Sequence, residues 1–366
     1  MNKVATPLKE VYSDAFLRQL GQAVQGQLPA FQVDKFAAAV QADDWSQLRL
    51  MERMTRIDTC LHQQFPSDFK AAAPILTAVS HQITGFAALC LPGYVAQYGL
   101  DDWQTSIGIL AVLTQSSSAE FAIRPFIEQA PAKTMAQILT WSHSDNADLR
   151  RLASEGCRPR LPWGRALKVF KHDPAPIFPI LENLMADSSK YVRTSVANNL
   201  NDISKDHPEQ VLQFVTPYWH QSPETDWIIK KALRTLFKAG RPEVMTLFGY
   251  PLTAAEALTL ARITSQPAAV KIGGHSQVMY QCQNGGERDL PLRLELGVDY
   301  IKANGQPKRK IFFLKDTVLA PGQKIDGTHK LNWQQLTTRT LYPGGHQLVL
   351  LANTIAIAQT TITVTK

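Results

Sequence analysis

The sequence has few cysteines, and none of them are arranged as a disulfide framework or a zinc site would require. Cys60, Cys90, Cys157 and Cys282 are far apart in a chain of 366 residues, and no Cys-x-x-Cys motif occurs. Secreted disulfide scaffolds and structural zinc sites both need closely spaced cysteines. We therefore expect four small apolar side chains in a protein of the reducing cytoplasm.

Long apolar runs and catalytic-metal motifs are also missing. No run reaches the roughly 18 residues that a membrane helix needs, and residues 1–16 lack the apolar core of a secretion signal. Neither His-Glu-x-x-His nor His-x-Glu with Pro-Cys-x-x-Cys occurs, and no glycine-rich phosphate loop precedes a helix. The sequence therefore predicts no membrane partner, no metal and no cofactor.

Positive charge is in modest excess. The chain has 38 Lys and Arg against 31 Asp and Glu, which gives a formal net charge of +7. This balance is compatible with a polyanionic partner, but the distribution of the charges matters more than their sum. A chain of this length is too long for a single hydrophobic core, so we expect two domains.

Helical periodicity extends over residues 13–265, and one pattern within it repeats about every 40 residues. Arg150, Arg193 and Lys230 each follow an apolar residue at equivalent places in three segments, and each segment follows a cluster of capping residues. HEAT-type helix pairs have this period and stack into a solenoid with a concave surface. We expect a mainly α fold over residues 1–265, a HEAT-like helical repeat solenoid.

The pattern of apolar residues in the sequence changes near residue 266. Short alternating apolar runs follow, separated by turn signals such as Asn304-Gly305 and Pro321-Gly322. About seven short strands in roughly 100 residues are typical of an immunoglobulin-like sandwich. We therefore expect a C-terminal all-β immunoglobulin-like sandwich over residues 266–366, without the paired cysteines of antibody domains.

The residues 148–163 hold the most unusual arrangement of charge in the chain. Arg151, Glu155 and Arg158 recur at i, i+4 and i+7 and share one face of a helix, and two prolines after them present Trp163 on a stiff turn. A salt bridge between Glu155 and Arg151 explains the carboxylate on spacing alone. Trp163 is either a core residue or, beside so many basic residues, a stacking surface.

Two strings carry a family resemblance. RRLASEGCRPRLPW, residues 150–163, and YVRTSVANNLNDISKDHP, residues 191–208, resemble the AlkC branch of the AlkC/AlkD DNA glycosylases. The resemblance implies HEAT-like repeats that remove positively charged alkylated bases from DNA without base flipping, and an Ig-like domain in a subset of members. It also implies that Glu155 is the catalytic carboxylate and that Glu120 lies near the lesion. On its own, Glu120 reads as an acid of the first helical turn.

Basic residues follow the repeat helices, and they predict a groove that holds the phosphates of a duplex. The alternative is a solvated charged face. Thr338 and Arg339 in the C-terminal domain are expected to touch the backbone or the minor groove. The complete set of candidate DNA-binding residues is Arg151, Arg158, Arg160, Lys190, Arg193, Lys205, Lys230, Lys231, Arg234, Lys238, Thr338 and Arg339.

The preferred hypothesis is a monofunctional DNA glycosylase of base excision repair that acts on 3-methyladenine and 3-methylcytosine in double-stranded DNA. Glu155 would stabilise the sugar cation and position water, Glu120 would assist, and Trp163 would support the lesion or the sugar. We expect a monomeric, cytoplasmic bacterial protein that associates with the nucleoid during repair. The alternative is a non-catalytic HEAT-repeat scaffold that binds nucleic acid or protein, which repeats and basic stripes alone do not exclude.

Overall fold

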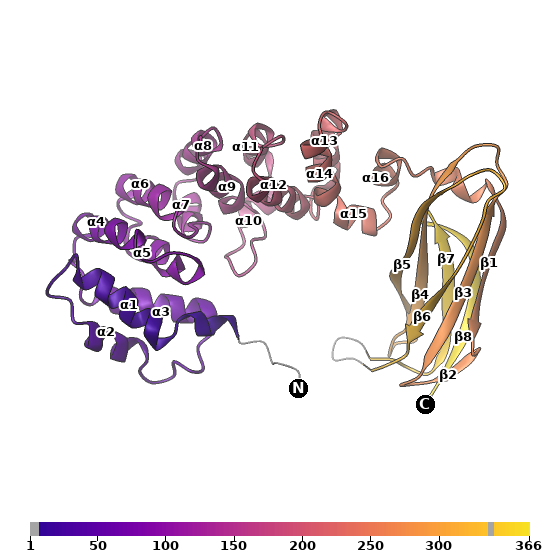
Figure 1. Cartoon of the computed structure of the whole chain (residues 1–366), viewed down its shortest axis with the longest axis horizontal. Coiled ribbons are helices and arrows are strands. Elements are labelled where there is room, and N and C mark those ends of the chain that lie inside the picture. Colours follow the sequence, from indigo (N-terminus) through magenta and orange to yellow (C-terminus); the bar gives the residue numbers. More distant parts are fainter. Residues whose placement is uncertain (1–6, 336–339) are drawn as a thin grey trace. The chain divides into compact units, whose positions relative to one another are not determined.

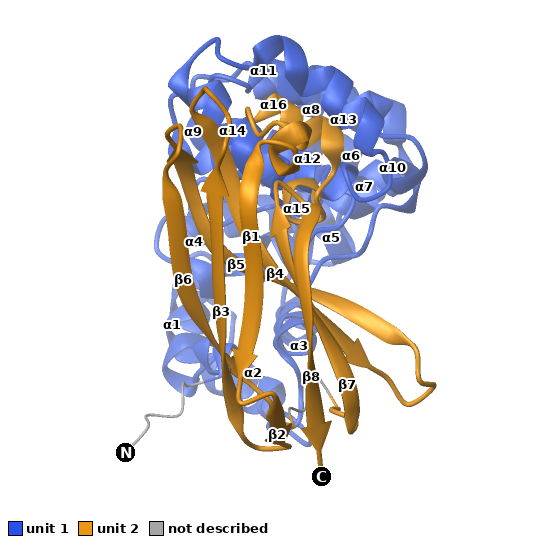
Figure 2. Ribbon diagram, turned by 90° about the vertical axis from the view of Figure 1, so that its right-hand side faces the viewer, with its two compact units in different colours: residues 1–235 blue, residues 236–366 orange. Residues whose placement is uncertain are grey.

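The chain folds into two compact units of different secondary structure. The structure, a computed structural model, describes residues 7–335 and 340–366. The units are Met1–Thr235 and Leu236–Lys366, coloured separately in Figure 2. A helical part followed by a β-sandwich confirms the predicted fold class. In the described ranges, no helix is long and apolar enough to cross a membrane.

The first unit is built from short helices that share capped starts and apolar faces. Side chains of Ser13, Asn146 and Ser222 accept hydrogen bonds from the first turns of α1, α9 and α14. The helices of this unit are η1 (Leu8–Val11), α1 (Asp14–Gln25), α2 (Val33–Val40), α3 (Leu50–His62), α4 (Phe69–Ser80), η2 (Phe86–Leu89), α5 (Cys90–Tyr98), α6 (Trp103–Leu113), α7 (Ile123–Gln129), α8 (Pro131–Ser142), α9 (Ala147–Gly156), α10 (Lys168–His172), η3 (Ala175–Ile177), α11 (Phe178–Asn183), α12 (Lys190–Ile203), α13 (Pro208–Val215), η4 (Thr216–Tyr218) and α14 (Pro223–Ala232).

The predicted repeat corresponds to helix pairs. Helices α9, α12 and α14 lie side by side in one row, while α8, α11 and α13 form the other row (Figure 1). Each pair buries its apolar faces against the next pair, which is why one pair is not stable alone. The periodicity seen in the sequence is therefore the spacing of stacked helical hairpins.

The arginine that recurs in the repeat has a structural function. Arg150 Nη1 donates to the carbonyls of Ser144 and Asp145, each at 2.9 Å, just before α9. Arg193 Nη1 donates in the same way to the carbonyls of Asp187 and Ser188, at 2.6 and 2.8 Å, before α12. The repeated arginine thus satisfies the carbonyls of the turn that leads into its own helix.

The second unit is a two-sheet sandwich. One sheet has the order β1-β3-β6 and the other has the order β2-β8-β7-β4-β5. Helix α15 (Arg234–Lys238) spans the division between the units, and α16 (Pro242–Leu247) and η5 (Leu252–Ala255) precede the sheets. The strands are β1 (Leu258–Gln266), β2 (Ala269–Lys271), β3 (His275–Asn284), β4 (Leu290–Ile301), β5 (Pro307–Leu319), β6 (Lys324–Asn332), β7 (Gly344–Ala352) and β8 (Ile355–Thr365).

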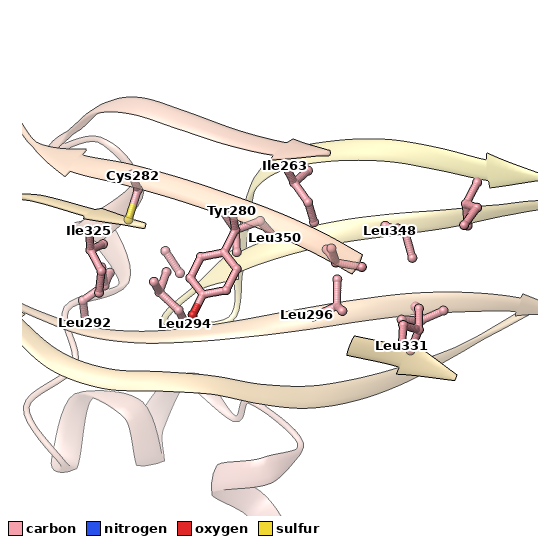
Figure 3. Close-up of a cluster of buried hydrophobic side chains, with 14 of the residues drawn as sticks. Ile263, Tyr280, Cys282, Leu292, Leu294, Leu296, Ile325, Leu331, Leu348 and Leu350 are labelled. Atoms are coloured by element: carbon pink, nitrogen blue, oxygen red, sulfur yellow. The ribbon is translucent and has the colours of Figure 1, made fainter. Parts of the chain in front are cut away.

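The core of the sandwich lies between the inner faces of the two sheets. Alternate residues of β3, such as Tyr280 and Cys282, point inward toward Leu294 of β4 and Leu350 of β7 (Figure 3). This alternation follows from the period of two residues in a strand. The indole of Trp333 is fully buried and donates to Ser276 Oγ at 3.0 Å.

Two details of the sequence prediction differ from the structure. Residues 258–265 were expected to be helical, but they belong to β1, so the expected boundary after residue 265 falls inside that strand. β1 pairs with β3 along its length, and this tertiary pairing overrides the local sequence preference. The polar strand β6 also has no strong sequence signal, and its pairing with β3 defines it.

Candidate active site

Glu155 lies in the last turn of α9, with its carboxylate directed into a polar network. Its residue is only 6% exposed. Ser195 Oγ of α12 donates to Oε2 at 2.6 Å, and Arg158 Nη1 donates to Oε1 at 2.6 Å. A carboxylate has about four acceptor positions, so these bonds leave room for further donors. The predicted salt bridge to Arg151 is present but longer, with Nη2 at 3.6 Å from Oε1.

Arg158 joins Glu155 to a second buried carboxylate. Its Nε and Nη2 lie 2.9 and 2.8 Å from Oδ2 of Asp202 in α12. Lys205 Nζ binds the other oxygen of Asp202 at 3.0 Å. Burial lowers the pKa of the Arg158 guanidinium, but the two carboxylates outweigh it, and the net pKa is raised. The Arg158 guanidinium is therefore fully charged and bound inside the protein, which argues against a direct phosphate contact.

Arg151 connects the two candidate carboxylates. Its Nη1 donates to Glu120 Oε2 and, at 2.6 Å, interacts with Ser118 Oγ, while its Nη2 faces Glu155. The guanidinium also lies 5.0 Å from the centre of the Tyr191 ring, in cation–π geometry. Burial lowers the pKa of Arg151, yet Glu120 and Glu155 raise it more strongly, so the net pKa is raised.

Glu120 differs from its expected local position. The spacing predicted an acid in the first turn of a helix, but α7 begins only at Ile123, and Glu120 lies in the preceding turn. Its partners are Ser118 Oγ from the same turn and Arg151 from the neighbouring helix. The alternative interpretation of Glu120 as a helix-dipole acid is therefore wrong, because Glu120 precedes α7 and its carboxylate is bound by Ser118 and Arg151.

Trp163 is presented to solvent by a strained turn. Its side chain is 62% exposed and its φ is +62°, a left-handed conformation that residues with a Cβ seldom adopt. Buried Arg124 holds the turn from below, because its Nε donates to the Arg165 carbonyl at 2.6 Å and its Nη1 to the Gly156 carbonyl at 2.9 Å. The exposed indole excludes a core role for Trp163 and is consistent with a stacking surface.

These residues surround a cavity of about 350 Å³, which we call the Glu120 cavity. Phe86 and Trp163 meet edge to face at its rim, with ring centres 6.2 Å apart. The other aromatic lining residues are Phe121 and Tyr191, and Glu120 and Arg151 supply the charged groups. Glu155 lies behind Arg151 and is not part of the lining. The cavity therefore combines an aromatic rim with an ion pair in its wall.

The ten described basic candidates differ in whether a carboxylate of the protein already pairs with their charged groups. Arg151, Arg158 and Lys205 belong to the carboxylate network, and Arg193 binds turn carbonyls. Arg160 forms an ion pair with Asp206 at 2.5 Å on the surface. Four of these five cations are therefore paired with a carboxylate, whereas Arg193 is held by backbone carbonyls.

A separate cluster of cations forms where α12 and α14 meet. Burial and the nearby charges of Arg234 and Lys190 lower the pKa of Lys231. Arg234 Nη2 donates to Asn198 Oδ1 at 3.2 Å, and Lys190 is exposed. Like charges placed this close together are typical of a surface that binds an anion. We call Lys190, Lys231 and Arg234 the cation cluster.

Lys230, Arg234 and Lys238 are spaced at i, i+4 and i+8, which would form one stripe on a continuous helix, but they lie on two helices. Helix α14 ends at Ala232 and α15 begins at Arg234, so the i, i+4 relation between Lys230 and Arg234 is interrupted, whereas Arg234 and Lys238 share α15. Lys230 instead lies 5.6 Å from the centre of the Trp219 ring. Lys238 belongs to the second unit and is exposed. Thr338 and Arg339 lie outside the described residues, so their predicted contacts remain predictions.

Several residues of the site were not found from the sequence. Ser195, Asn199 and Asp202 are polar, lie on one face of α12 at i, i+4 and i+7, and are all buried. The spacing of these polar residues is visible in the sequence and could have indicated that they share a face of the helix. Arg124 and Phe86, by contrast, come from other elements and carry no local signal of their function.

Comparisons with known proteins agree with this architecture. The family described as DNA alkylation repair enzyme matches residues 109–236, and the C-terminal Ig-like domain of YhaZ matches residues 259–366. The chain is 40% identical to YhaZ of Bacillus subtilis (strain 168), over 94% of this chain and 96% of that protein. It is also similar to the alkylpurine DNA glycosylase AlkC of Pseudomonas fluorescens, solved with DNA containing an abasic site analog.

The structural similarity to that protein extends over the whole chain. The TM-score is 0.89 at 35% sequence identity, and the match covers 99% of this chain and 100% of the other. Both parts of the chain, the helical repeat unit and the Ig-like domain, are therefore matched in sequence and in structure. The chain belongs to the AlkC-type family of DNA alkylation repair glycosylases.

Proposed function

We propose that this protein hydrolyses the N-glycosidic bond of cationic alkylated bases, 3-methyladenine and 3-methylcytosine, in double-stranded DNA as a monomer. Glu155 is the catalytic carboxylate, Glu120 assists it, and Trp163 supports the damaged nucleotide through its π face. The observation that carries the proposal is the convergence of Glu120 and Glu155 on one guanidinium, that of Arg151, at an aromatic-rimmed cavity.

The chemistry suits these residues. A base methylated at a ring nitrogen carries a positive charge and leaves neutral, so its departure needs no general acid and no cofactor. The sugar that remains is oxocarbenium-like, and a nearby carboxylate stabilises this charge and positions the attacking water. The arrangement resembles that of glycosidases, with one essential carboxylate in place of an acid and base pair.

Resident cations hold the carboxylates of the site before DNA binds. In the free protein Arg151, Arg158 and Lys205 compensate Glu120, Glu155 and Asp202. Ser195 and Arg158 hold one oxygen each of Glu155, which orients the carboxylate. Arg151 lies between Glu155 and the cavity. The 3.6 Å ion pair between Arg151 and Glu155 must therefore break before the Glu155 carboxylate can reach a sugar. A substrate cation is suited to this exchange, since it replaces the charge that Arg151 withdraws.

The same logic gives selectivity without a base-flipping pocket. A lesion that already carries charge weakens its own glycosidic bond and interacts favourably with Glu120, whereas a neutral base gains neither effect. We propose that the damaged base stays in the helix while the protein approaches its sugar. Equal rates of release for cationic and neutral lesions would contradict this part of the proposal.

DNA binding is assigned to the cations that lack an internal carboxylate. The cation cluster of Lys190, Lys231 and Arg234 is the leading phosphate site, because its members repel one another until an anion binds. Lys230, Lys238 and Arg193 supply further positive charge, and Arg160 is a further candidate although Asp206 pairs with it. The proposed contacts of Thr338 and Arg339 add the second unit to the same duplex.

The test is the release of 3-methyladenine and 3-methylcytosine from methylated duplex DNA. Glu155→Gln keeps the size of the side chain and removes its charge, so we expect loss of base release with retained DNA binding. Glu128→Gln is the matched control, since Glu128 is a partly exposed carboxylate paired with Arg165 at 2.6 Å. Full activity of Glu155→Gln would remove Glu155 from the mechanism.

A further inference from the structure

A second cavity adjoins the Glu120 cavity and is not used by the proposed reaction. Its volume is about 240 Å³, and residues of α3, α5, α7 and the turn around Trp163 line it. Trp163 and Phe121 line both cavities. Because Asp58 is its only described carboxylate, we call it the Asp58 cavity.

Two buried polar groups in this lining lack partners. Asp58 is 1% exposed, and its Oδ1 has no hydrogen-bond partner among the described residues. Arg124 is equally buried, and its Nη2 is also unpartnered within the described part of the chain. An unmet buried polar group is costly, and native proteins seldom retain one without a reason. Two such groups at one cavity indicate a ligand that supplies both an acceptor and a donor.

The neighbouring helix leaves space for the Asp58 carboxyl. A Cβ on Gly93 of α5 would lie 2.6 Å from Asp58 Oδ2 and 3.3 Å from Met54 Cε. Only a residue without a side chain therefore lets the carboxyl border the cavity. The remaining walls, which include Met51, Met54 and Ala96, are mostly apolar. An apolar cleft with a few placed polar groups is the usual form of a small-molecule site.

The protonation state of the Asp58 carboxyl determines which hydrogen-bonding groups a ligand must present. No cation pairs with Asp58 among the described residues, and burial raises its pKa well above the ordinary value, so the neutral acid is favoured. A neutral carboxyl donates through its O–H and accepts through its C=O. The N1 and amino edge of adenine presents the matching acceptor and donor. Methylation at N3 of adenine leaves that edge free, whereas methylation at N3 of cytosine blocks the equivalent edge.

We propose that the Asp58 cavity binds a free adenine-type base, with 3-methyladenine as its ligand in the enzyme's cycle. The assignment of that ligand rests on the proposed function, but binding of the base is testable without DNA. The cavity is smaller than the roughly 300–1,000 Å³ of sites for drug-sized molecules, which suits a base and not a nucleotide. The shared wall at Trp163 places this site next to the cavity where the base would be released.

The experiment is calorimetric titration of the full chain with free bases. Adenine and 3-methyladenine should bind with saturation, whereas 3-methylcytosine and N6,N6-dimethyladenine, which lack the paired edge, should not. Asp58→Leu should weaken adenine binding by at least roughly tenfold, because it removes a two-point hydrogen-bonded pair. Asp58→Asn should retain binding, because a carboxamide also offers one donor and one acceptor face.

A pair of glycine variants tests the site by shape alone. Gly93→Ala should weaken adenine binding, because the new Cβ displaces the Asp58 carboxyl. Gly108→Ala in α6 is the control, since no atom lies within 4 Å of a Cβ at that position. The two variants change helix preference equally, so melting temperatures report any general destabilisation separately.

The outcomes separate this inference from the proposed function. Base release from DNA without measurable binding of 3-methyladenine would overturn the cavity assignment and leave the glycosylase unaffected. Saturable binding by wild type that Asp58→Leu and Gly93→Ala leave unchanged would also overturn it. If Asp58→Leu does not fold, Gly93→Ala and the blocked ligands decide the matter. Adenine binding without base release would support the cavity and contradict the proposed function.

Discussion

Replacing Arg158 with Met is the change whose effect follows most directly from the geometry. Arg158 is almost fully buried and bonds two carboxylates, Glu155 at 2.6 Å and Asp202 at 2.8 Å. Met has a similar volume but no charge, so both carboxylates lose a partner in a site that water hardly reaches. Breaking a buried ion pair from one side costs about 3–5 kcal/mol. We expect Arg158→Met to lower the free energy of unfolding of the helical unit by this amount.

Arg160→Met is the matched control. Arg160 lies two residues further on and pairs with Asp206 at 2.5 Å, but both side chains are partly exposed to solvent. Such pairs contribute roughly 0–1 kcal/mol, so the control should change stability little. Urea denaturation followed by circular dichroism measures both variants. Equal small losses would refute the structural role of Arg158 and return it to the candidate phosphate ligands.

A compensating substitution sharpens the test. In Asp202→Asn, a neutral carboxamide replaces one of the two carboxylates that Arg158 compensates. Adding Arg158→Met to this variant should therefore cost less than adding it to wild type. Purely additive losses would show that Arg158 stabilises the protein through packing and not through charge.

Three further predictions concern Ser195, Lys231 and Asp58. Ser195→Ala removes the 2.6 Å donor to Glu155, so single-turnover base release should fall by roughly tenfold, as loss of a bond to a charged group implies, with duplex affinity unchanged. Lys231→Gln should weaken binding to any DNA sequence and reduce the slope of log affinity against log salt by about 1. Asp58→Asn should stabilise the protein at pH 7, because the folded pKa of Asp58 is raised and folding must therefore protonate a carboxylate that is ionised in the unfolded chain. This gain should disappear below about pH 4, where folded and unfolded carboxyls are both protonated.

Each of these predictions has a clear contrary result. Lower duplex affinity in Ser195→Ala would show that Ser195 acts on DNA binding and not on the carboxylate. An unchanged salt slope in Lys231→Gln would mean that Lys231 neutralises no phosphate. If Asp58→Asn were less stable than wild type at pH 7, Asp58 would have a stabilising partner that its surroundings do not show.

The local parts of the site were predictable from the sequence because one helix carries them. Arg151, Glu155 and Arg158 lie at i, i+4 and i+7, and helix geometry alone brings their side chains together. The stiff turn that carries Trp163 likewise follows from the two prolines before it, Pro159 and Pro162. Burial was not predictable in the same way: this polar face, expected at the surface, packs against α12 and is nearly closed to water.

Contacts between helices account for most of what the sequence did not reveal. The residues that complete the network are 31, 40 and 44 positions from their partners: Glu120 with Arg151, Ser195 with Glu155, and Asp202 with Arg158. Whether these side chains meet depends on how neighbouring helix pairs stack, and the periodicity within one helix does not describe that stacking.

By itself, the sequence determined the order of the two units, the period of the helical repeat and the charged helix with its tryptophan, since these depend on local backbone geometry and on patterns of apolar residues. Only the tertiary structure decided which arginines are compensated internally, where the cation cluster lies, and that Asp58 and Gly93 border a cavity. The physical reason is that the state of a charged group depends on water and on partners from distant segments, and packing alone determines both.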